Sequence, residues 1–452
     1  MDRMSEYYGF LSEIAQSMKA REVINTELYK KYNVKRGLRN ADGTGVLVGL
    51  TAIGEVHGYI VDENEKVDVE GKLYYRGIDV EDLIARKEAE NRFGFEETIF
   101  LLLFGTLPTK DELEHFNKMM QVARNLPRGF AEDMIIRVPS KDIMNKLATS
   151  VLGLYCYDDN PDERTVANVL RQSAELIARM PAMIAYCYNA KQHYLDKESL
   201  HIHEQDPSLS LVENFLSLIR PDRKFTDEEA KLLDTCLILH AEHGGGNNSS
   251  FTAHVISSTG TDTYSAVSAS IGALKGPRHG GANKAVMAMM DDIEANVKDW
   301  NSDDEVAAYL EKILRKEAND NSGLIYGMGH AVYTVSDPRT TILRQNAERL
   351  AYERGFEKEY QLYTNIERLS PEVFSKVRGM DKKICANVDL YSGFVYKILG
   401  IDPALYTPMF AMGRSVGWCA HVIEEVAFGG KIIRPAYKSV CKRAQYIPLE
   451  DR

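Results

Sequence analysis

The sequence predicts a mainly α-helical protein, and three observations support this. Apolar residues recur at three- and four-residue spacing in several segments, which is the pattern of one buried helix face. Only one region, near the N-terminus, has the features of β-strands. No regular alternation of strands and helices is evident, so a parallel α/β sheet is not expected.

Three helices can be placed with their ends. The apolar run 95–104 stops at Gly105, which is typical of a helix C-terminus. A second helix covers residues 171–188, where Pro181 either kinks it or begins a new helix. A third follows Asp262, a good N-cap, and ends at a Gly-Pro pair. Its remaining faces carry small residues, so we expect it at a closely packed interface.

The strand region lies between residues 58 and 75. Segments 58–62 and 66–69 flank a polar turn, and segment 72–75 follows after a glycine. We therefore expect a small β-hairpin region beside a helical protein.

Composition excludes several classes of function. The chain has 452 residues and a formal net charge of −11, with no block of Lys and Arg, so nucleic acid and anionic membranes are not expected partners. The six cysteines form no CxxC pair, which argues against a zinc ribbon and favours a reducing compartment. The first 20 residues lack a signal-peptide core, and the most apolar run is too short to cross a membrane. We expect a cytoplasmic protein.

Histidines in glycine-rich segments are the first candidates for chemistry. His243, His279, His330 and, less clearly, His254 stand in predicted loops, where a rigid scaffold can aim side chains. In HAEHGGGNNSS (240–250), the two histidines could form a metal pair, but no third ligand is evident.

Two further segments place a histidine in a shaped loop. In KGPRHGGAN (275–283), His279 precedes a helical run at 284–290, whose dipole would favour a neutral ring; the alternative is an ordinary turn histidine. In YGMGHAVY (326–333), followed by SDPR, His330 and Arg339 could bind an extended anionic ligand, or Arg339 could lie on the surface.

Asp389 in ANVDLYSG (386–393) is the candidate base. A lone Asp between apolar residues is either a helix cap or a partly dry carboxylate, whose raised pKa would make it a better base. The guanidinium groups of Arg414 and Arg434 could each bind a carboxylate through two hydrogen bonds.

Together these segments resemble the citrate synthase family. The match runs in order over nearly the whole chain and includes LYYRGIDVEDL (73–83) and FLLLFGTLP (100–108). Its most specific parts are GPRHGGAN (276–283), YGMGHAVYTVSDPR (326–339) and NVDLYSGFVY (387–396). The first 40 residues match poorly, and we assign them no role.

The resemblance implies a condensation of acetyl-CoA with oxaloacetate and water, giving citrate and CoA, as in the tricarboxylic acid cycle. Asp389 would remove a methyl proton, His279 would hydrogen-bond the thioester oxygen, and His330 would polarise the ketone. No metal or bound cofactor is expected, since CoA enters as a substrate. The residues implied to bind oxaloacetate are His243, Arg339, Arg414 and Arg434, and those implied to hold the CoA adenine are Leu324, Ile325, Tyr326, Gly327, Met328 and Gly329.

The family also implies an architecture. A large helical domain, residues 1–279 and 394–452, would carry a smaller helical domain inserted at 280–393. The active site would lie in the cleft between them, closing over oxaloacetate. The expected assembly is a homodimer in which Arg434 reaches the partner's site.

Three other functions compete with this interpretation. The nearest is a 2-methylcitrate synthase using propionyl-CoA, which differs by one methylene in a pocket, worth only ~1–3 kcal/mol of discrimination. A metal-dependent hydrolase using His240 and His243 is more distant. A non-catalytic helical scaffold would leave the histidines, the arginines and Asp389 unexplained.

Overall fold

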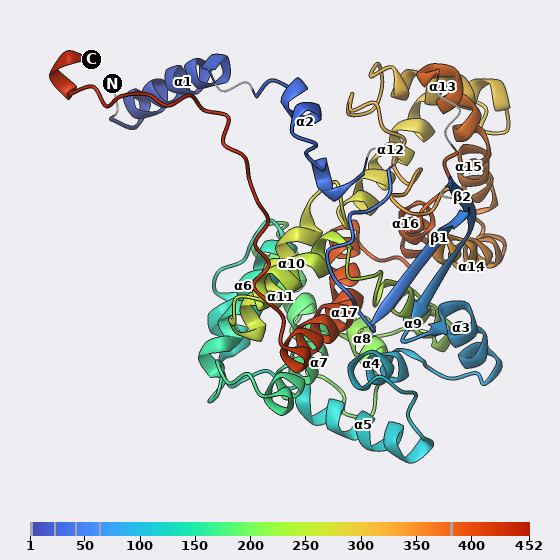
Figure 1. The fold of residues 1–452 in the computed structure, drawn as a ribbon. Helices are drawn as coiled ribbons and strands as arrows, with labels where there is room; N and C mark the ends of the chain where they lie inside the picture. Colours follow the sequence, from blue (N-terminus) through green and yellow to red (C-terminus); the bar gives the residue numbers. More distant parts are fainter. Residues whose placement is uncertain (1–2, 22–23, 41–42, 63–64, 380–382) are drawn as a thin grey trace. The chain divides into compact units, whose positions relative to one another are not determined.

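The computed structural model describes residues 3–21, 24–40, 43–62, 65–379 and 383–452. Contacts divide the chain into two units, a terminal unit (Met1–Leu50 with Arg434–Arg452) and a main unit (Thr51–Ile433). The terminal unit contains α1 (Arg3–Arg21), α2 (Glu27–Lys31) and a short 3-10 helix (Arg36–Leu38). Its C-terminal part is extended up to a final short turn (Figure 1). The division predicted at residues 280 and 393 stays a prediction.

The main unit is helical with one small sheet, as predicted. Its helices are α3 (Val80–Ala89), α4 (Phe95–Phe104), α5 (Lys110–Ala123), α6 (Ile143–Leu154), α7 (Val166–Tyr194), α8 (Leu211–Ile219), α9 (Asp227–His240), α10 (Asn248–Ser257), α11 (Thr263–Lys275), α12 (Ala282–Asn296), α13 (Asp303–Leu314), α14 (Pro338–Arg354), α15 (Glu357–Arg378), α16 (Val388–Ile398) and α17 (Tyr406–Phe428). No helix in the described part of the chain is both long and apolar enough to cross a membrane.

The sheet has three antiparallel strands in chain order: β1 (Gly54–Asp62), β2 (Glu65–Tyr75) and β3 (Ile78–Asp79). The two later segments predicted as separate strands form one continuous strand, β2, so that part of the prediction was wrong. The glycine between them, Gly71, lies within the continuous strand and forms no turn. Residues 63 and 64 of the predicted turn lie outside the described residues.

Local sequence explains where the helices begin and end. Thr109, Ser210 and Thr226 each form a capping box with a Glu three residues later, at α5, α8 and α9. Asp262 caps α11 as predicted, accepting a bond from the backbone N–H of Ser265. Helix α4 has the predicted bounds, and α7 continues through Pro181 as one helix rather than starting again there.

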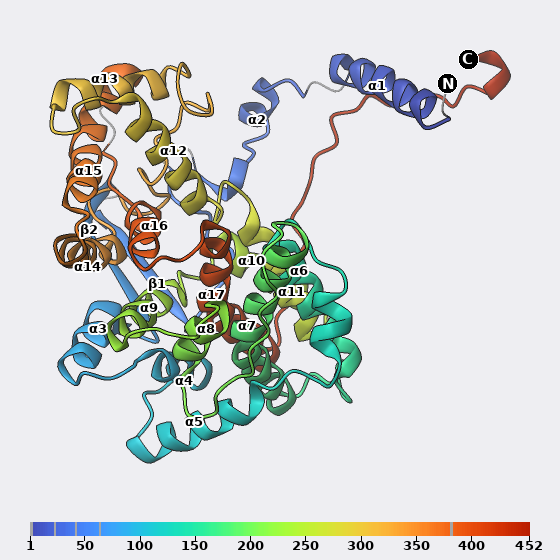
Figure 2. The same ribbon diagram turned by 180° about the vertical axis from the view of Figure 1, so that it is seen from behind.

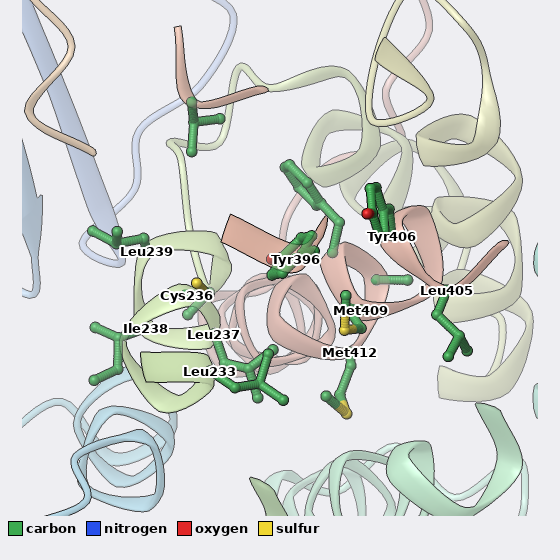
Figure 3. Packing of buried hydrophobic residues seen from close by; sticks show 14 of the residues in the cluster. Leu233, Cys236, Leu237, Ile238, Leu239, Tyr396, Leu405, Tyr406, Met409 and Met412 are labelled. Carbon is green, nitrogen blue, oxygen red and sulfur yellow. The ribbon is translucent and has the colours of Figure 1, made fainter. Parts of the chain in front are cut away.

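Helix α17 is the centre of the main unit. All of its residues from 406 to 423 are buried, and it packs against α4, α6, α7, α9, α10, α11 and α12 (Figures 1 and 2). Figure 3 shows apolar side chains of α9, including Leu233 and Leu237, beside Met409 and Met412 of α17. A helix that is buried on all sides holds its polar residues in fixed, dry positions.

Two glycines let α17 lie against the end of α9. A Cβ on Gly413 would lie 2.9 Å from His240 Cβ, and one on Gly417 would lie 2.5 Å from the Ala241 carbonyl oxygen. The Gly417 N–H donates to that same oxygen over 3.1 Å. Only a residue without a side chain permits this approach.

We predict that Gly417→Ala destabilises the protein by roughly 1–3 kcal/mol or more, because the new methyl group overpacks a buried contact. Thermal unfolding followed by circular dichroism checks this. Gly9→Ala in α1 is the matched control, since a Cβ there meets nothing within 4 Å. A melting temperature lowered no more by Gly417→Ala than by Gly9→Ala would contradict the packing argument.

Candidate functional site

The candidate residues come from five segments of the main unit. His243 follows α9, His279 lies in the turn before α12, and Asp389 begins α16. His330 lies in the loop before α14, and Arg339 and Arg414 lie within helices. His254, predicted in a loop, instead lies in helix α10, so that prediction was wrong.

Three of these segments are joined directly. The rings of His243 and His330 meet edge to face with centroids 5.1 Å apart, and His330 stacks on Tyr333 at 4.7 Å. The backbone N–H of Gly329 donates to the Cys385 carbonyl over 2.7 Å. The loop that carries His330 is therefore fixed both to His243 and to the segment before Asp389.

Asn387 organises the loop 324–329 and the start of α16 together. Its side-chain oxygen accepts from the Asp389 N–H over 3.0 Å, and its side-chain nitrogen donates to the Gly329 carbonyl over 2.8 Å. Gly327, with φ of +81°, lies so close to Leu390 that a Cβ would be 2.9 Å from that residue's Cβ. Within this loop Leu324 is exposed, whereas Ile325 is buried.

Asp389 is a dry carboxylate rather than a helix cap, because Asn387 is the N-cap of α16. Its Oδ1 is buried and has no hydrogen-bond partner among the described residues. Burial raises the pKa of Asp389 to about 7, against the opposing positive charges of Arg339 and Arg414. A carboxyl with such a pKa is suited to accept a proton near neutral pH.

The two site histidines for which a shift is resolved are neutral. Burial lowers the pKa of His279 to about 3, with a further contribution from Arg414, and it lowers that of His243 well below its usual value. The sequence predicted a neutral His279 because of a helix dipole, but α12 begins three residues later, at Ala282, and burial is the main cause.

Hydrogen bonds limit the tautomers of two histidines. The Nδ1 of His330 faces the backbone N–H groups of Val332 and Tyr333, both at 3.1 Å. Since those groups can only donate, Nδ1 accepts, and the proton of a neutral ring is on Nε2. The Nε2 of His279 lies 3.0 Å from the Ser249 hydroxyl, whose single hydrogen can serve that nitrogen or Asn247 Oδ1.

The two buried arginines differ in what they can still bind. Arg339 donates Nε and Nη2 to the carboxylate of Asp337, at 3.0 and 2.7 Å, which leaves Nη1 for another acceptor. Arg414 is fully buried, and only its Nε is bonded, to the His240 carbonyl at 2.7 Å. Its Nη1 and Nη2 have no hydrogen-bond partner among the described residues. Two buried, unbonded nitrogens are costly and indicate a site for an anionic acceptor.

Arg434 is the one predicted site residue outside the main unit. It is exposed and belongs to the terminal unit. The sequence analysis also missed three contributors: Ser249, Tyr333 and Asp337. Only Asp337 had a usable signal, because an Asp before Pro is a typical helix start, and it does cap α14.

The alternative metal pair does not assemble. His240 Nε2 lies 3.0 Å from the hydroxyl of Tyr396. Among the described residues, the cluster with metal-ligand spacing is formed by His254, His421 and Glu424, and it includes neither His240 nor His243. The geometry therefore gives no support to a hydrolase at this position.

We predict that the ligand-free Asp389→Asn variant is more stable than the wild type, and that this difference grows as pH rises from about 4 to about 7. The folded state raises this pKa from 3.8 to about 7, so ionisation favours the unfolded chain across that interval and wild-type stability falls there. The gap between variant and wild type should be small at pH 4 and reach at most roughly 4 kcal/mol above pH 7. Melting temperatures at a series of pH values measure it, and a gap that does not widen with pH would refute the dry carboxylate.

Comparison with known proteins shows which family the chain belongs to. The family model described as citrate synthase, C-terminal domain, matches residues 41–436. The citrate synthase of Deinococcus radiodurans is 36% identical over 386 residues, covering 85% of this chain and 93% of that one. The 2-methylcitrate synthase of Shewanella oneidensis is 33% identical over 388 residues, 84% of this chain and 92% of that one.

A solved structure supports the same assignment. The ternary complex of carboxymethyl coenzyme A and oxaloacetate with citrate synthase from Thermoplasma acidophilum has a TM-score of 0.74 at 28% identity, covering 93% of this chain and 99% of that one. The structure of citrate synthase from Thermotoga maritima has a TM-score of 0.72 at 31% identity and covers 93% and 99%. The chain therefore belongs to the citrate synthase family.

Proposed function

We propose that the protein condenses acetyl-CoA with oxaloacetate and water to give citrate and CoA. One observation carries the proposal: Asp389, with a pKa near 7, shares a dry site with neutral histidines and two buried arginines. This combination supplies a base, two hydrogen-bond donors and positive charge for a dicarboxylate. CoA is a substrate, and the proposal needs no bound cofactor.

The first step is removal of a proton from the acetyl methyl group by Asp389. A thioester methyl is a weak acid, so the enolate oxygen needs stabilisation as charge develops. His279 is the proposed donor to that oxygen. When the Ser249 hydroxyl donates to His279 Nε2, the neutral ring keeps its proton on Nδ1 and can donate it to the substrate.

The second step joins the enol carbon to the ketone carbon of oxaloacetate. His330 is the proposed donor to the ketone oxygen, which becomes the alkoxide and then the hydroxyl of the product. Its Nε2–H tautomer, set by the bonds to Nδ1, presents a donor without a net charge. Water then cleaves the thioester of citryl-CoA to release citrate and CoA.

The substrate carboxylates would be held by arginines. The unbonded Nη1 and Nη2 of Arg414 can form a bidentate pair with one carboxylate. Arg339, already paired with Asp337, can offer Nη1, and His243, whose buried Nε2 has no bonded partner in the described chain, adds a further contact. Backbone groups of residues 324–329 are the proposed contacts for the CoA adenine.

A 2-methylcitrate synthase is the second candidate, favoured by the Shewanella oneidensis relative. It would use the same residues with propionyl-CoA. The kcat/KM values for the two acyl-CoA substrates decide between them, and a preference for propionyl-CoA would replace the first substrate while leaving the mechanism intact.

The cytoplasmic location inferred from the sequence stays a prediction.

We predict that Asp389→Asn keeps the fold but lowers kcat by about 10²–10⁴-fold, the usual contribution of a general base. Glu294→Gln is the matched control, because burial also raises the pKa of Glu294 while that residue lies in α12 and pairs with Lys397. The direct measurement is exchange of acetyl methyl protons with solvent in the presence of oxaloacetate. Exchange at the wild-type rate in Asp389→Asn would remove this residue from the role.

We also propose that the protein is a homodimer whose sites are completed by Arg434 of the other chain. Large apolar residues are exposed in the extended parts of the terminal unit, where a single chain gives them little cover. The part-exposed side of α11 carries small residues that allow close approach of a partner helix. The most exposed large apolar residues of the terminal unit are Leu47, Leu50, Tyr437, Tyr446 and Leu449.

We predict complementation between two inactive variants. Arg434→Ala and Asp389→Asn should each be nearly inactive alone but regain activity when dissociated and reassembled together, since one site of each mixed dimer is intact. Arg443→Ala, an exposed arginine of the same C-terminal segment, is the control and should stay active alone. Mixed dimers that form without restored activity would show that Arg434 does not act in trans.

A further inference from the structure

A second cluster of ionisable residues lies at the contact of α10 with α17 and is not used by the proposed reaction. We propose that His254, His421 and Glu424 form a structural binding site for a divalent metal ion of the zinc class. One nitrogen of each histidine and one oxygen of Glu424 lie within 4.8 Å of one another. The cluster is enclosed: the His421 side chain is 0% exposed, that of Glu424 10% and that of His254 14%.

The two rings face each other in a way that fits a shared ion. His254 Nε2 lies 3.1 Å from His421 Nδ1. Two nitrogens bound tetrahedrally to zinc at about 2.0–2.1 Å lie roughly 3.3 Å apart, so little movement is needed. The third proposed ligand, Glu424 Oε2, is 3.7 Å from His421 Nδ1.

Carboxylates hold the outer nitrogen of each ring. His421 Nε2 lies 3.1 Å from Glu242 Oε1, and His254 Nδ1 lies 3.5 Å from Glu425 Oε2. A metal-binding histidine usually donates its other N–H to a carboxylate, which fixes the tautomer. With both outer nitrogens held by carboxylates, the two inner nitrogens face each other, and either a proton or a metal ion can lie between them.

The carboxylates give the cluster negative charge that a bound cation would offset. Glu242, Glu424 and Glu425 surround two histidines, and no Lys or Arg in the described chain lies within ion-pair distance of them, although Arg414 and Arg76 contribute positive charge from farther away. Glu424 Oε1 accepts from the backbone of Ala52 at 2.7 Å, whereas its buried Oε2 has no hydrogen-bond partner among the described residues. Two nitrogens and one oxygen suit zinc and its neighbours better than calcium or magnesium.

The site would brace the segment that carries His243 without touching the reacting groups. Glu242, which orients His421, directly precedes His243 in the chain, and the Gly417 N–H donates to Ala241. Metal binding would therefore link α10, α17 and the end of α9. The expectation that the reaction needs no metal is unaffected, because no proposed chemical step uses this ion.

The test uses the full chain, with Cys156 and Cys441 changed to Ser because these exposed thiols could bind zinc independently. Protein stripped by a chelator is titrated with Zn²⁺ by calorimetry, and its melting temperature is followed. We expect one ion per chain and a higher melting temperature. His254→Gln and Glu424→Gln should each weaken binding by roughly 100-fold, and Glu425→Gln by about 10–100-fold. His115→Gln, an exposed histidine of α5, is the matched control and should bind like the parent.

Co²⁺ gives a second reading that does not depend on the variants folding. A tetrahedral site of nitrogen and oxygen ligands produces intense visible bands without the sulfur charge-transfer band of a thiolate site. Absence of a one-to-one complex, or binding that His254→Gln and Glu424→Gln leave unchanged in folded protein, would overturn the proposal. The two rings would then share a proton. Neither result bears on the proposed condensation, which is assayed separately.

Discussion

The contact of α17 with the end of α9 positions the groups on which the proposed function of the main unit depends. Gly413 and Gly417 remove the side chains that would keep the two helices apart. The close approach puts the His240 carbonyl within 2.7 Å of Arg414 Nε, so it fixes one edge of that guanidinium and leaves the other edge unbonded. The same approach presents Glu242 to His421. One packing contact therefore positions both Arg414, a proposed binding group, and Glu242, which holds His421.

Removal of water is the common cause of the unusual charges around that contact. Burial lowers the pKa of His279 and of His243, raises that of Asp389 and lowers that of Arg414 to about 10. Each shift favours the uncharged form because burial outweighs the charges of neighbouring groups. Such a site suits the proposed substrate, oxaloacetate, which would bring two negative charges of its own.

Much of the fold could be predicted because its signals are local. The apolar run before Gly105 and the cap at Asp262 gave two helices with the observed ends. The prediction of the strand region was wrong at one point. A glycine inside β2 is a typical turn residue, and the local sequence does not show that its neighbours continue the strand. Whether Pro181 interrupts α7 depends on tertiary packing, which the local sequence does not contain.

The site was only partly predictable. Asp389, His279 and His330 stand in segments long enough to be recognised, but the residues that hold them in place do not. Ser249 and Tyr333 are common residue types whose importance comes from contacts across the fold. Asp337 occupies two nitrogens of Arg339, so the fork expected there for a carboxylate is already in use. Partners distant in sequence decide these roles, and a single sequence does not reveal them.

The central claim is that the unbonded edge of Arg414 holds a substrate carboxylate in a dry site. Calorimetric titration of oxaloacetate into wild-type protein and into Arg414→Gln tests it most directly, with circular dichroism to confirm that the variant is folded. Loss of one partner of a buried, hydrogen-bonded charge pair costs about 2–5 kcal/mol, so we expect affinity to fall by roughly 30-fold or more. Equal affinity of the two proteins for oxaloacetate would contradict the account.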